Sequence, residues 1–158
     1  MKTGLAVALL LVSTQGHAAP ALESAFGGWS GNWSGGGTVT MTNGSTEQIR
    51  CRAAYIVNAG GRAAQQTLRC ASDSYRVDIN SQIISEGRSL SGSWAETTRG
   101  LSGNVSGYVT GAHVAANVTG ADFAARLNLQ TQGDRQVVTI RPLTGTDVAV
   151  VTVSLHKS

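Results

Sequence analysis

The chain has 158 residues, of which 41% are hydrophobic and 13% are charged, and its formal net charge is +3. This length fits one domain, and the charged share is roughly half of the usual value of about 25%. With 20 glycines and only 2 prolines, the composition excludes a collagen-like chain, a coiled coil and a charge-driven disordered chain.

The N-terminus has the pattern of a secretory signal peptide. Lys2 supplies a positive charge, an apolar run extends from Gly4 to Val12, and Gly16-His17-Ala18 is a small-x-small cleavage site. This run is shorter than the about 20 apolar residues of a membrane helix. We therefore expect residues 1–18 to be a signal peptide, residues 19–27 a flexible mature N-terminus, and residues 28–158 a single domain that is periplasmic or secreted.

The charge of the mature chain argues against nucleic acid as a partner. Removal of Lys2 lowers the formal charge from +3 to +2. Binding to a phosphate backbone needs a basic patch or stripe on one face. We expect neither a nucleic-acid partner nor a membrane span.

The only two cysteines, Cys51 and Cys70, predict a β-hairpin. A hairpin that turns at Gly60-Gly61 places them directly opposite each other, because each lies nine residues from the nearer glycine. Opposed strand residues have Cα atoms about 4.5 to 5.5 Å apart, which a disulfide spans. An even number of cysteines in an exported chain favours a structural disulfide. A metal or redox pair is disfavoured, because there is no CxxC spacing.

The rest of the mature chain has the alternating apolar and polar residues of half-buried strands. No stretch of 12 or more residues has a helical period. The sequence therefore predicts an all-β fold, an antiparallel up-and-down meander of 8–10 strands that forms a small barrel. A β-sandwich and a half-rolled sheet are the alternatives. The turn signals are Asn43-Gly44, Gly60-Gly61, Glu86-Gly87, Arg99-Gly100, Gly111, Gly120, Gly133-Asp134 and Thr144-Gly145.

Two resemblances agree with this fold. Gly31-Asn32-Trp33 resembles the opening strand of calycin barrels, the lipocalin and avidin group, in which the tryptophan closes one end of the barrel. The segments 33–39, 49–53 and 68–72 are similar to a family of small exported bacterial proteins without an assigned activity. This second resemblance covers most of the mature chain. It implies export and a compact all-β structure, and it carries over no catalytic residues.

Motifs for catalysis and metal binding are missing from the sequence. No Gly-x-Ser-x-Gly motif occurs, and the glycine run 35–37 leads into strand residues rather than into a helix that holds phosphate. In the mature chain His113 and His156 each stand alone, without a second ligand at metal spacing. We therefore expect no enzymatic activity, no metal and no cofactor.

Three arginines form a candidate site for an anion or a partner protein. In the hairpin register that pairs the cysteines, Arg52 lies directly opposite Arg69, and Arg50 lies on the same outward face. Opposed like charges are unfavourable, so acids such as Glu47, Asp73 or Asp78, an aromatic ring, or an anionic partner must offset them. A solvated arginine ladder paired to these acids is the alternative interpretation.

A second candidate site lies on the inward face of the predicted barrel. Trp94, Tyr75 and Glu96 are its candidate ligand-binding residues, with Glu96 as a polar anchor in an apolar pocket. The inward glycines, which have no side chain to fill space, favour a cavity. Alternation places these side chains inside: Tyr75, Leu90, Trp94, Val105, Val109, Phe123, Leu127 and Leu129, interleaved with Gly92, Gly103 and Gly107.

These patterns favour an exported, non-enzymatic binding protein for a small apolar or amphiphilic ligand. The alternative is a protein-interaction module of the cell envelope, such as a periplasmic protease inhibitor or a structural factor.

Overall fold

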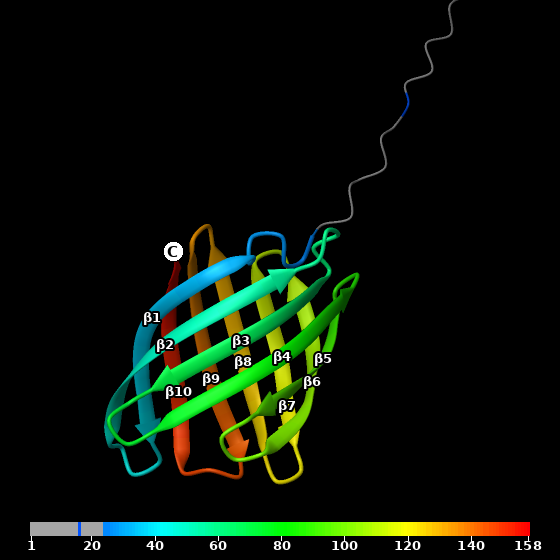
Figure 1. Ribbon diagram of the computed structural model, residues 1–158. Helices are drawn as coiled ribbons and strands as arrows, with labels where there is room; N and C mark the ends of the chain where they lie inside the picture. Colours follow the sequence, from blue (N-terminus) through cyan, green and yellow to red (C-terminus); the bar gives the residue numbers. More distant parts are fainter. Residues whose placement is uncertain (1–15, 17–23) are drawn as a thin grey trace, which may run out of the picture.

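The computed structural model describes residue 16 and residues 24–158, and the latter form a closed antiparallel barrel of ten strands (Figure 1). Each strand pairs with the next one in the sequence, and β1 pairs with β10 to close the barrel. The predicted meander is confirmed, and the sandwich and the half-rolled sheet are excluded. The strands are β1 (Gly31–Met41), β2 (Thr46–Val57), β3 (Ala63–Ala71), β4 (Arg76–Glu86), β5 (Ser89–Glu96), β6 (Leu101–Thr110), β7 (His113–Gly120), β8 (Ala124–Gln132), β9 (Arg135–Thr144) and β10 (Val148–Lys157).

Apart from Gly16, the predicted signal peptide of residues 1–18 lies outside the described residues, as do residues 19–23 of the predicted flexible segment. Residues 24–27 pack onto the barrel, and Phe26 is fully buried. Phe26, within the predicted flexible segment, thus packs with the core of the barrel. Among the residues that the structure describes, no helix has the length and the apolarity that crossing a bilayer requires.

The β2–β3 hairpin has the predicted register. Cys51 lies opposite Cys70, and Arg52 lies opposite Arg69. Gly61 adopts a φ of 66° in the turn, a conformation that favours glycine, and its N–H donates to the carbonyl of Asn58. Turn chemistry and strand pairing therefore agree on one register.

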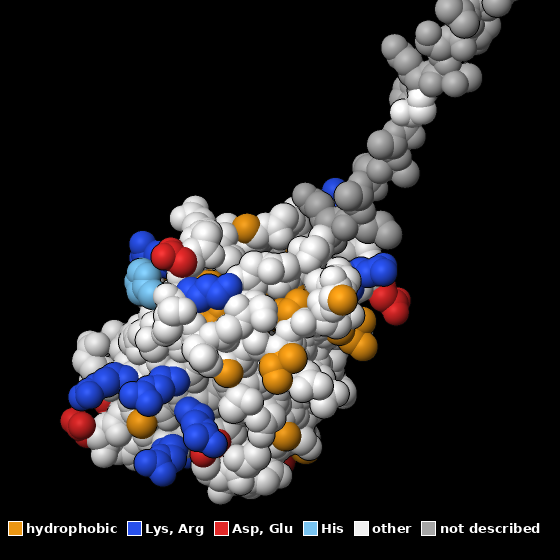
Figure 2. Space-filling model, turned by 45° about the horizontal axis from the view of Figure 1, so that its top comes forward, with side chains coloured by type: hydrophobic (Ala, Val, Ile, Leu, Met, Phe, Trp, Pro, Cys, Tyr) orange, Lys and Arg blue, Asp and Glu red, His pale blue; other side chains and the backbone are white. Residues whose placement is uncertain are grey.

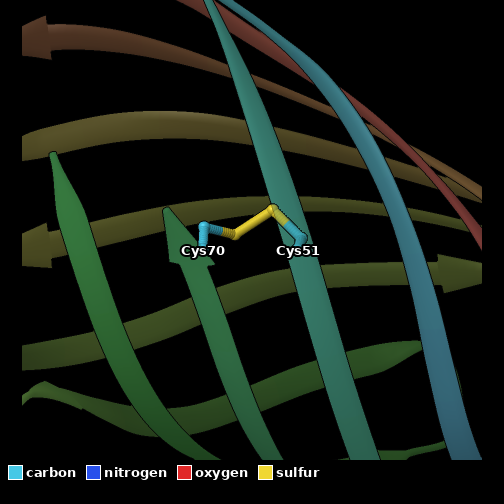
Figure 3. The surroundings of a disulfide bond; sticks show 2 residues. All are labelled: Cys51 and Cys70. Atoms are coloured by element: carbon cyan, nitrogen blue, oxygen red, sulfur yellow. A yellow bond between two sulfur atoms is a disulfide. The ribbon is translucent and has the colours of Figure 1, made fainter. Parts of the chain in front are cut away.

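The disulfide between Cys51 and Cys70 is confirmed, and it joins the two strands on the inner face of the barrel (Figure 3). The two Cα atoms are 4.1 Å apart. Cross-linking a loop of this size stabilises a fold by about 3 kcal/mol. The disulfide also indicates an oxidising compartment, because such bonds are rare in the cytosol.

The barrel has two unlike ends. The first carries the β2–β3, β4–β5, β6–β7 and β8–β9 turns together with the C-terminus (Figure 1), and we call it the sealed end. The turn of residues 24–29 packs there, because the N–H of Phe26 donates to the carbonyl of Gly61. The opposite end carries the other five inter-strand turns, including the β9–β10 turn, and we call it the open end.

An aromatic cluster fills the sealed end. The ring of Trp29 lies 5.0 Å from that of Phe26 and 5.2 Å from that of Tyr55, and Trp33 meets Tyr55 edge to face. The indole N–H of Trp33 donates to the carbonyl of Trp29 at 2.8 Å, which satisfies a buried donor. Over the same ring, Lys157 holds its ammonium 5.5 Å from the centroid. We call Phe26, Trp29, Trp33 and Tyr55 the aromatic plug.

Inward glycines mark places where neighbouring strands come very close. A Cβ at Gly35 would overlap the carbonyl oxygen of Ser154 on β10, and a Cβ at Gly103 would overlap that of Thr119 on β7. β1 turns sharply along its length in Figure 1. The same overlap holds at Gly92 and Gly107. The expectation that these glycines leave empty space is therefore wrong, because the backbone of the next strand occupies it.

Candidate functional site

The interior near the open end is lined by apolar side chains that keep part of their surface accessible. Strand pairing places these residues on the inner face at neighbouring heights, since Val105 pairs with Val118, and Leu127 pairs with Ile140. We call this set the apolar lining: Val39, Leu68, Ile79, Val105, Val118, Leu127, Ile140 and Val151, all only partly buried.

Several inward-facing residues nearer the sealed end are buried. Leu129 lies two residues beyond Leu127 on β8, and Val109 lies four residues beyond Val105 on β6. Both Leu129 and Val109 belong to the core cluster, together with the aromatic plug. Val57, Ile83 and Val138 also face inward nearer the sealed end and are only partly buried, so burial is greater in that half but not complete.

Trp94 lies on the inner face of β5, as predicted, and its indole is held in place at the open end. The indole N–H donates to the carbonyl of Thr119 at 3.1 Å, and the ring packs 6.0 Å from that of Phe123. A Cβ at Gly120 would come within 3.3 Å of the indole, so the ring passes directly over that glycine. Trp94 thus offers a fixed apolar edge beside the apolar lining.

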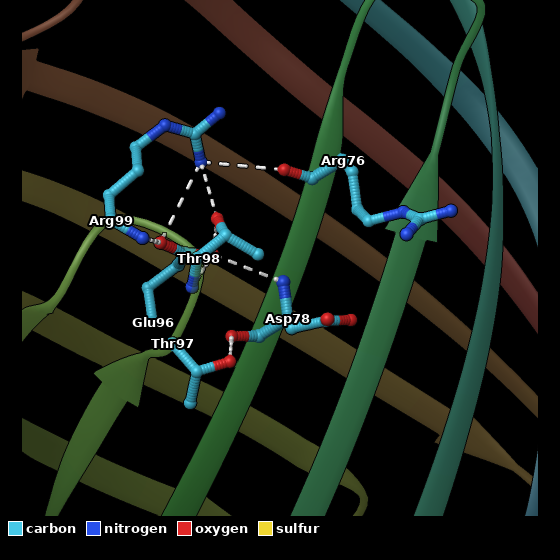
Figure 4. Close-up of polar contacts among 6 residues, drawn as sticks. All are labelled: Arg76, Asp78, Glu96, Thr97, Thr98 and Arg99. Atoms are coloured by element: carbon cyan, nitrogen blue, oxygen red, sulfur yellow. Dashed lines mark hydrogen bonds and ion pairs between the residues drawn. The ribbon is translucent and has the colours of Figure 1, made fainter.

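Glu96 lies at the end of β5 and is 5% exposed. Its carboxylate accepts hydrogen bonds from the backbone N–H groups of Asp78, Thr98 and Arg99 and from the Thr98 hydroxyl (Figure 4). The Arg99 guanidinium adds an ion pair at 3.7 Å. The carboxylate therefore closes the β5–β6 turn, and its oxygens are already engaged by donors of the protein itself.

Two opposing effects act on the pKa of Glu96. Burial alone raises it, because the charged form loses its hydration. Hydrogen bonds from Thr98, Asp78 and Arg99 to the charged form outweigh this effect, so that the net pKa lies below its ordinary value. Glu96 is thus held as a carboxylate in a turn and does not have the raised pKa of a buried acid catalyst.

Tyr75 does not lie inside the barrel, and its predicted inward position is wrong. It belongs to the turn between β3 and β4, is 57% exposed, and accepts at its carbonyl from the N–H of Ser72. The Arg99 guanidinium lies 4.5 Å from the centroid of its ring. Strand alternation does not extend to this residue, because β4 begins only at Arg76.

The predicted arginine site forms on the outer face of β2–β4. Arg50, Arg52 and Arg69 are exposed, and Arg76 joins them from the start of β4. We call these four residues the arginine surface. They line a depression of about 650 Å³, and Figure 2 shows basic side chains gathered there. Asp78 also lines the depression and forms an ion pair with Arg69 at 3.6 Å.

Of the acids expected to neutralise the arginine surface, only Asp78 forms an ion pair with one of its arginines. Glu47 accepts from the hydroxyl and the N–H of Ser74, and these hydrogen bonds lower its pKa. Asp78 pairs with Arg69 alone. Within residues 24–158, Arg50, Arg52 and Arg76 form no ion pair with a carboxylate, so this ladder of exposed arginines is paired to an acid on the next strand only at Arg69.

The sequence did not predict the positions of Phe26 and Trp29 in the aromatic plug or of Arg76 in the arginine surface. Phe26 and Trp29 fall in a segment without strand alternation, and only their aromatic character indicates burial. Arg76 lies next to an unforeseen turn, so its approach to Arg69 depends on the β3–β4 register, in which Ala71 opposes Arg76. In both cases the tertiary arrangement, and not a local pattern, positions the residue.

Neither histidine of residues 24–158 lies in the two candidate sites described above. His113 and His156 are both exposed, at the ends of β7 and β10. Among the described residues, no three His, Cys, Asp or Glu side chains lie close enough together to hold a metal ion. What the arrangement offers chemically is an apolar interior near one end and a positively charged depression on the outer wall.

Known proteins resemble this chain in structure. No protein-family model and no curated protein matches its sequence. Rv2717c from M. tuberculosis matches it with a TM-score of 0.68 at 15% identity, over 90% of this chain and 99% of that one. The S-type phycobiliprotein lyase CPES from Guillardia theta matches with a TM-score of 0.56 at 12% identity, over 84% and 90%. At such identities the similarity establishes the barrel fold alone.

Proposed function

We propose that this chain is an exported, non-enzymatic binding protein that takes an apolar molecule, or the apolar part of an amphiphile, into the barrel through the open end. One observation carries the proposal: the apolar lining stays partly accessible although every residue in it faces inward. Apolar surface left in contact with water is a source of binding free energy of about 25 cal/mol per Å².

Further features support the same function. The aromatic plug and the disulfide constrain the barrel before a guest binds, so that binding would cost little conformational entropy in the protein. One of the similar structures is named a phycobiliprotein lyase, which agrees with a barrel that handles another molecule. The disulfide and the predicted signal peptide favour the periplasm or the extracellular space as its location.

Binding without catalysis is part of the proposal. Glu96, the one charged residue that is buried within residues 24–158, is saturated by donors of its own turn. It lacks the free lone pairs that a general base uses. The wall facing a guest is aliphatic, which suits retention rather than reaction.

The proposal is tested with an uncharged fluorescent probe, 1-N-phenylnaphthylamine, and two tryptophan variants of β4. Ile79 faces inward in the apolar lining, whereas Ile84 on the same strand is an exposed outer residue. We expect saturable binding to the parent chain, binding at least about tenfold weaker in Ile79→Trp because the new ring fills the guest's space, and unchanged affinity in Ile84→Trp.

Circular dichroism of both variants checks that the barrel is retained. Absence of saturable binding to the parent chain, or equal affinity in Ile79→Trp and Ile84→Trp, contradicts a guest in the interior. Capture of one defined protein partner by a chain that does not bind the probe would instead support the protein-interaction alternative.

A further inference from the structure

The arginine surface concentrates positive charge that the protein does not neutralise. Arg52 lies directly opposite Arg69 across β2 and β3, where like charges are unfavourable. Four guanidinium groups and the carboxylate of Asp78 line one depression. One exposed pair of like charges costs little stability, because the two side chains can move apart. Four arginines around one depression repel one another more strongly, which favours a shared anionic ligand.

Within the described chain, neighbouring carboxylates neutralise only one of the four arginines. Asp78 reaches Arg69 at 3.6 Å, and Glu96 pairs with Arg99. Glu47 is engaged by Ser74. Among residues 24–158, Arg50, Arg52 and Arg76 are therefore left without a carboxylate in ion-pair range, and their guanidinium groups remain free to bind an external anion.

The floor of the depression is built to let an anion approach. Between the arginines lie small residues of β1 and the hairpin, and the volume of about 650 Å³ exceeds what a phosphate group needs. Ser34 pairs with Arg52, and Gly36 pairs with Arg50, so that no bulky side chain of β1 stands between the guanidinium groups and solvent. Besides the arginines and Asp78, the lining residues are small: Ser34, Gly35, Cys51, Cys70 and Ala71, of which Cys51 and Cys70 point their side chains inward.

We propose that the arginine surface binds a phosphate-bearing anion with more than one negative charge, at a site on the outer wall that is separate from the barrel interior. Arginine forms paired hydrogen bonds with phosphate oxygens, and its charge persists at every physiological pH. The guanidinium groups of Arg52 and Arg69, on adjacent strands, donate hydrogen bonds to the oxygens of the anion. Arg50 and Arg76 add positive charge beside them. Bound anion removes the repulsion that the free surface carries.

The chain supplies a matched control for this site. Arg126 on β8 lies directly opposite Arg141 on β9, which is the same cross-strand arrangement of two exposed arginines. Neither residue lines the depression. Replacing either pair by glutamine removes the same charge from the molecule, so a difference between the two double variants reports the site and not the net charge.

The test is calorimetric titration of the full mature chain with inorganic pyrophosphate at low ionic strength. We expect saturable binding that weakens at least about tenfold in Arg52→Gln/Arg69→Gln, since each charge-assisted hydrogen bond contributes on that scale. Affinity in Arg126→Gln/Arg141→Gln should stay within about twofold of the parent, the small change coming from long-range charge.

A parallel arm uses vesicles of phosphatidylglycerol, with phosphatidylcholine vesicles as the control. Binding of pyrophosphate identifies a soluble phosphate compound as the ligand class, and binding of the anionic vesicles alone identifies a lipid headgroup. Failure of the parent chain to bind either, or equal weakening in the two double variants, overturns the proposal. The uncharged probe reports the interior independently, so this outcome leaves the proposed function standing.

Discussion

The two ends of the barrel are made from the same ten strands, with the same alternation of inward and outward side chains, but they bury their inner faces differently. At the sealed end the turn of residues 24–29 lies across the opening, and the aromatic plug is buried. At the open end no such segment covers the apolar lining within the described chain, and its side chains stay partly accessible.

This difference shows what a strand pattern does and does not determine. Alternation decides which side chains face inward, and it is the same at both ends. Closure depends on an added segment, because the strands alone leave both mouths of a ten-stranded barrel uncovered. In this chain the residues just before β1 provide that segment on one side only, and the proposed guest would enter from the other side.

The largest effect is expected from removing the centre of the plug. Phe26→Ala takes a fully buried ring from the sealed end, and such truncations cost about 3–5 kcal/mol. Urea unfolding monitored by tryptophan fluorescence measures the loss. A change below about 1 kcal/mol would mean that the turn of residues 24–29 does not seal the barrel.

A sharper comparison uses two leucines on one strand. Leu129 is buried near the sealed end, and Leu127 belongs to the apolar lining. We expect Leu129→Ala to cost about 3 kcal/mol and Leu127→Ala about 1 kcal/mol, because Leu127 is only partly buried in the folded state. Equal losses in urea unfolding would show that the two halves of the interior are packed alike.

The smallest effect is a pH dependence that arises at the sealed end. Burial raises the pKa of Tyr55 to about 12, although a hydrogen bond from Gln66 lowers it. Between about pH 10 and pH 12 the unfolded chain loses the phenol proton while the folded chain keeps it, so stability falls as the pH rises.

Comparison with Tyr55→Phe isolates this effect. The parent chain should lose up to about 2–3 kcal/mol more than the variant across that range. At neutral pH the variant is the less stable of the two, because the hydroxyl also donates to the side-chain oxygen of Gln136. Parallel stability curves for the two chains above pH 10 would contradict a buried phenol.

Much of the fold could be predicted from the sequence, because its signals are local. The glycine pair at 60–61 and the two cysteines agree on one hairpin register, and that register alone places Arg52 opposite Arg69. Alternation along β5 correctly places Trp94 and Glu96 on the inner face. Each of these inferences needs only a period of two and one turn.

The remaining features depend on contacts between distant segments. Phe26 is buried because it meets the β2–β3 turn, which is about 35 residues away in the sequence, at Gly61. Tyr75 breaks the alternation because a turn interrupts the strands there. Glu96 faces inward as expected, yet donors from its own turn and from Asp78 satisfy it. Whether an inward carboxylate serves a ligand or a turn depends on these partners, which alternation does not reveal.

The proposed binding of a guest beside the apolar lining is tested most directly by methyl NMR of the folded chain during titration with 1-decanol. The account predicts saturable shifts in the methyl groups of Val105, Leu127 and Val151, with little change at Ile56 and Ile84 on the outer wall. Shifts restricted to those outer isoleucines, or no saturable shift of any methyl group, would contradict it.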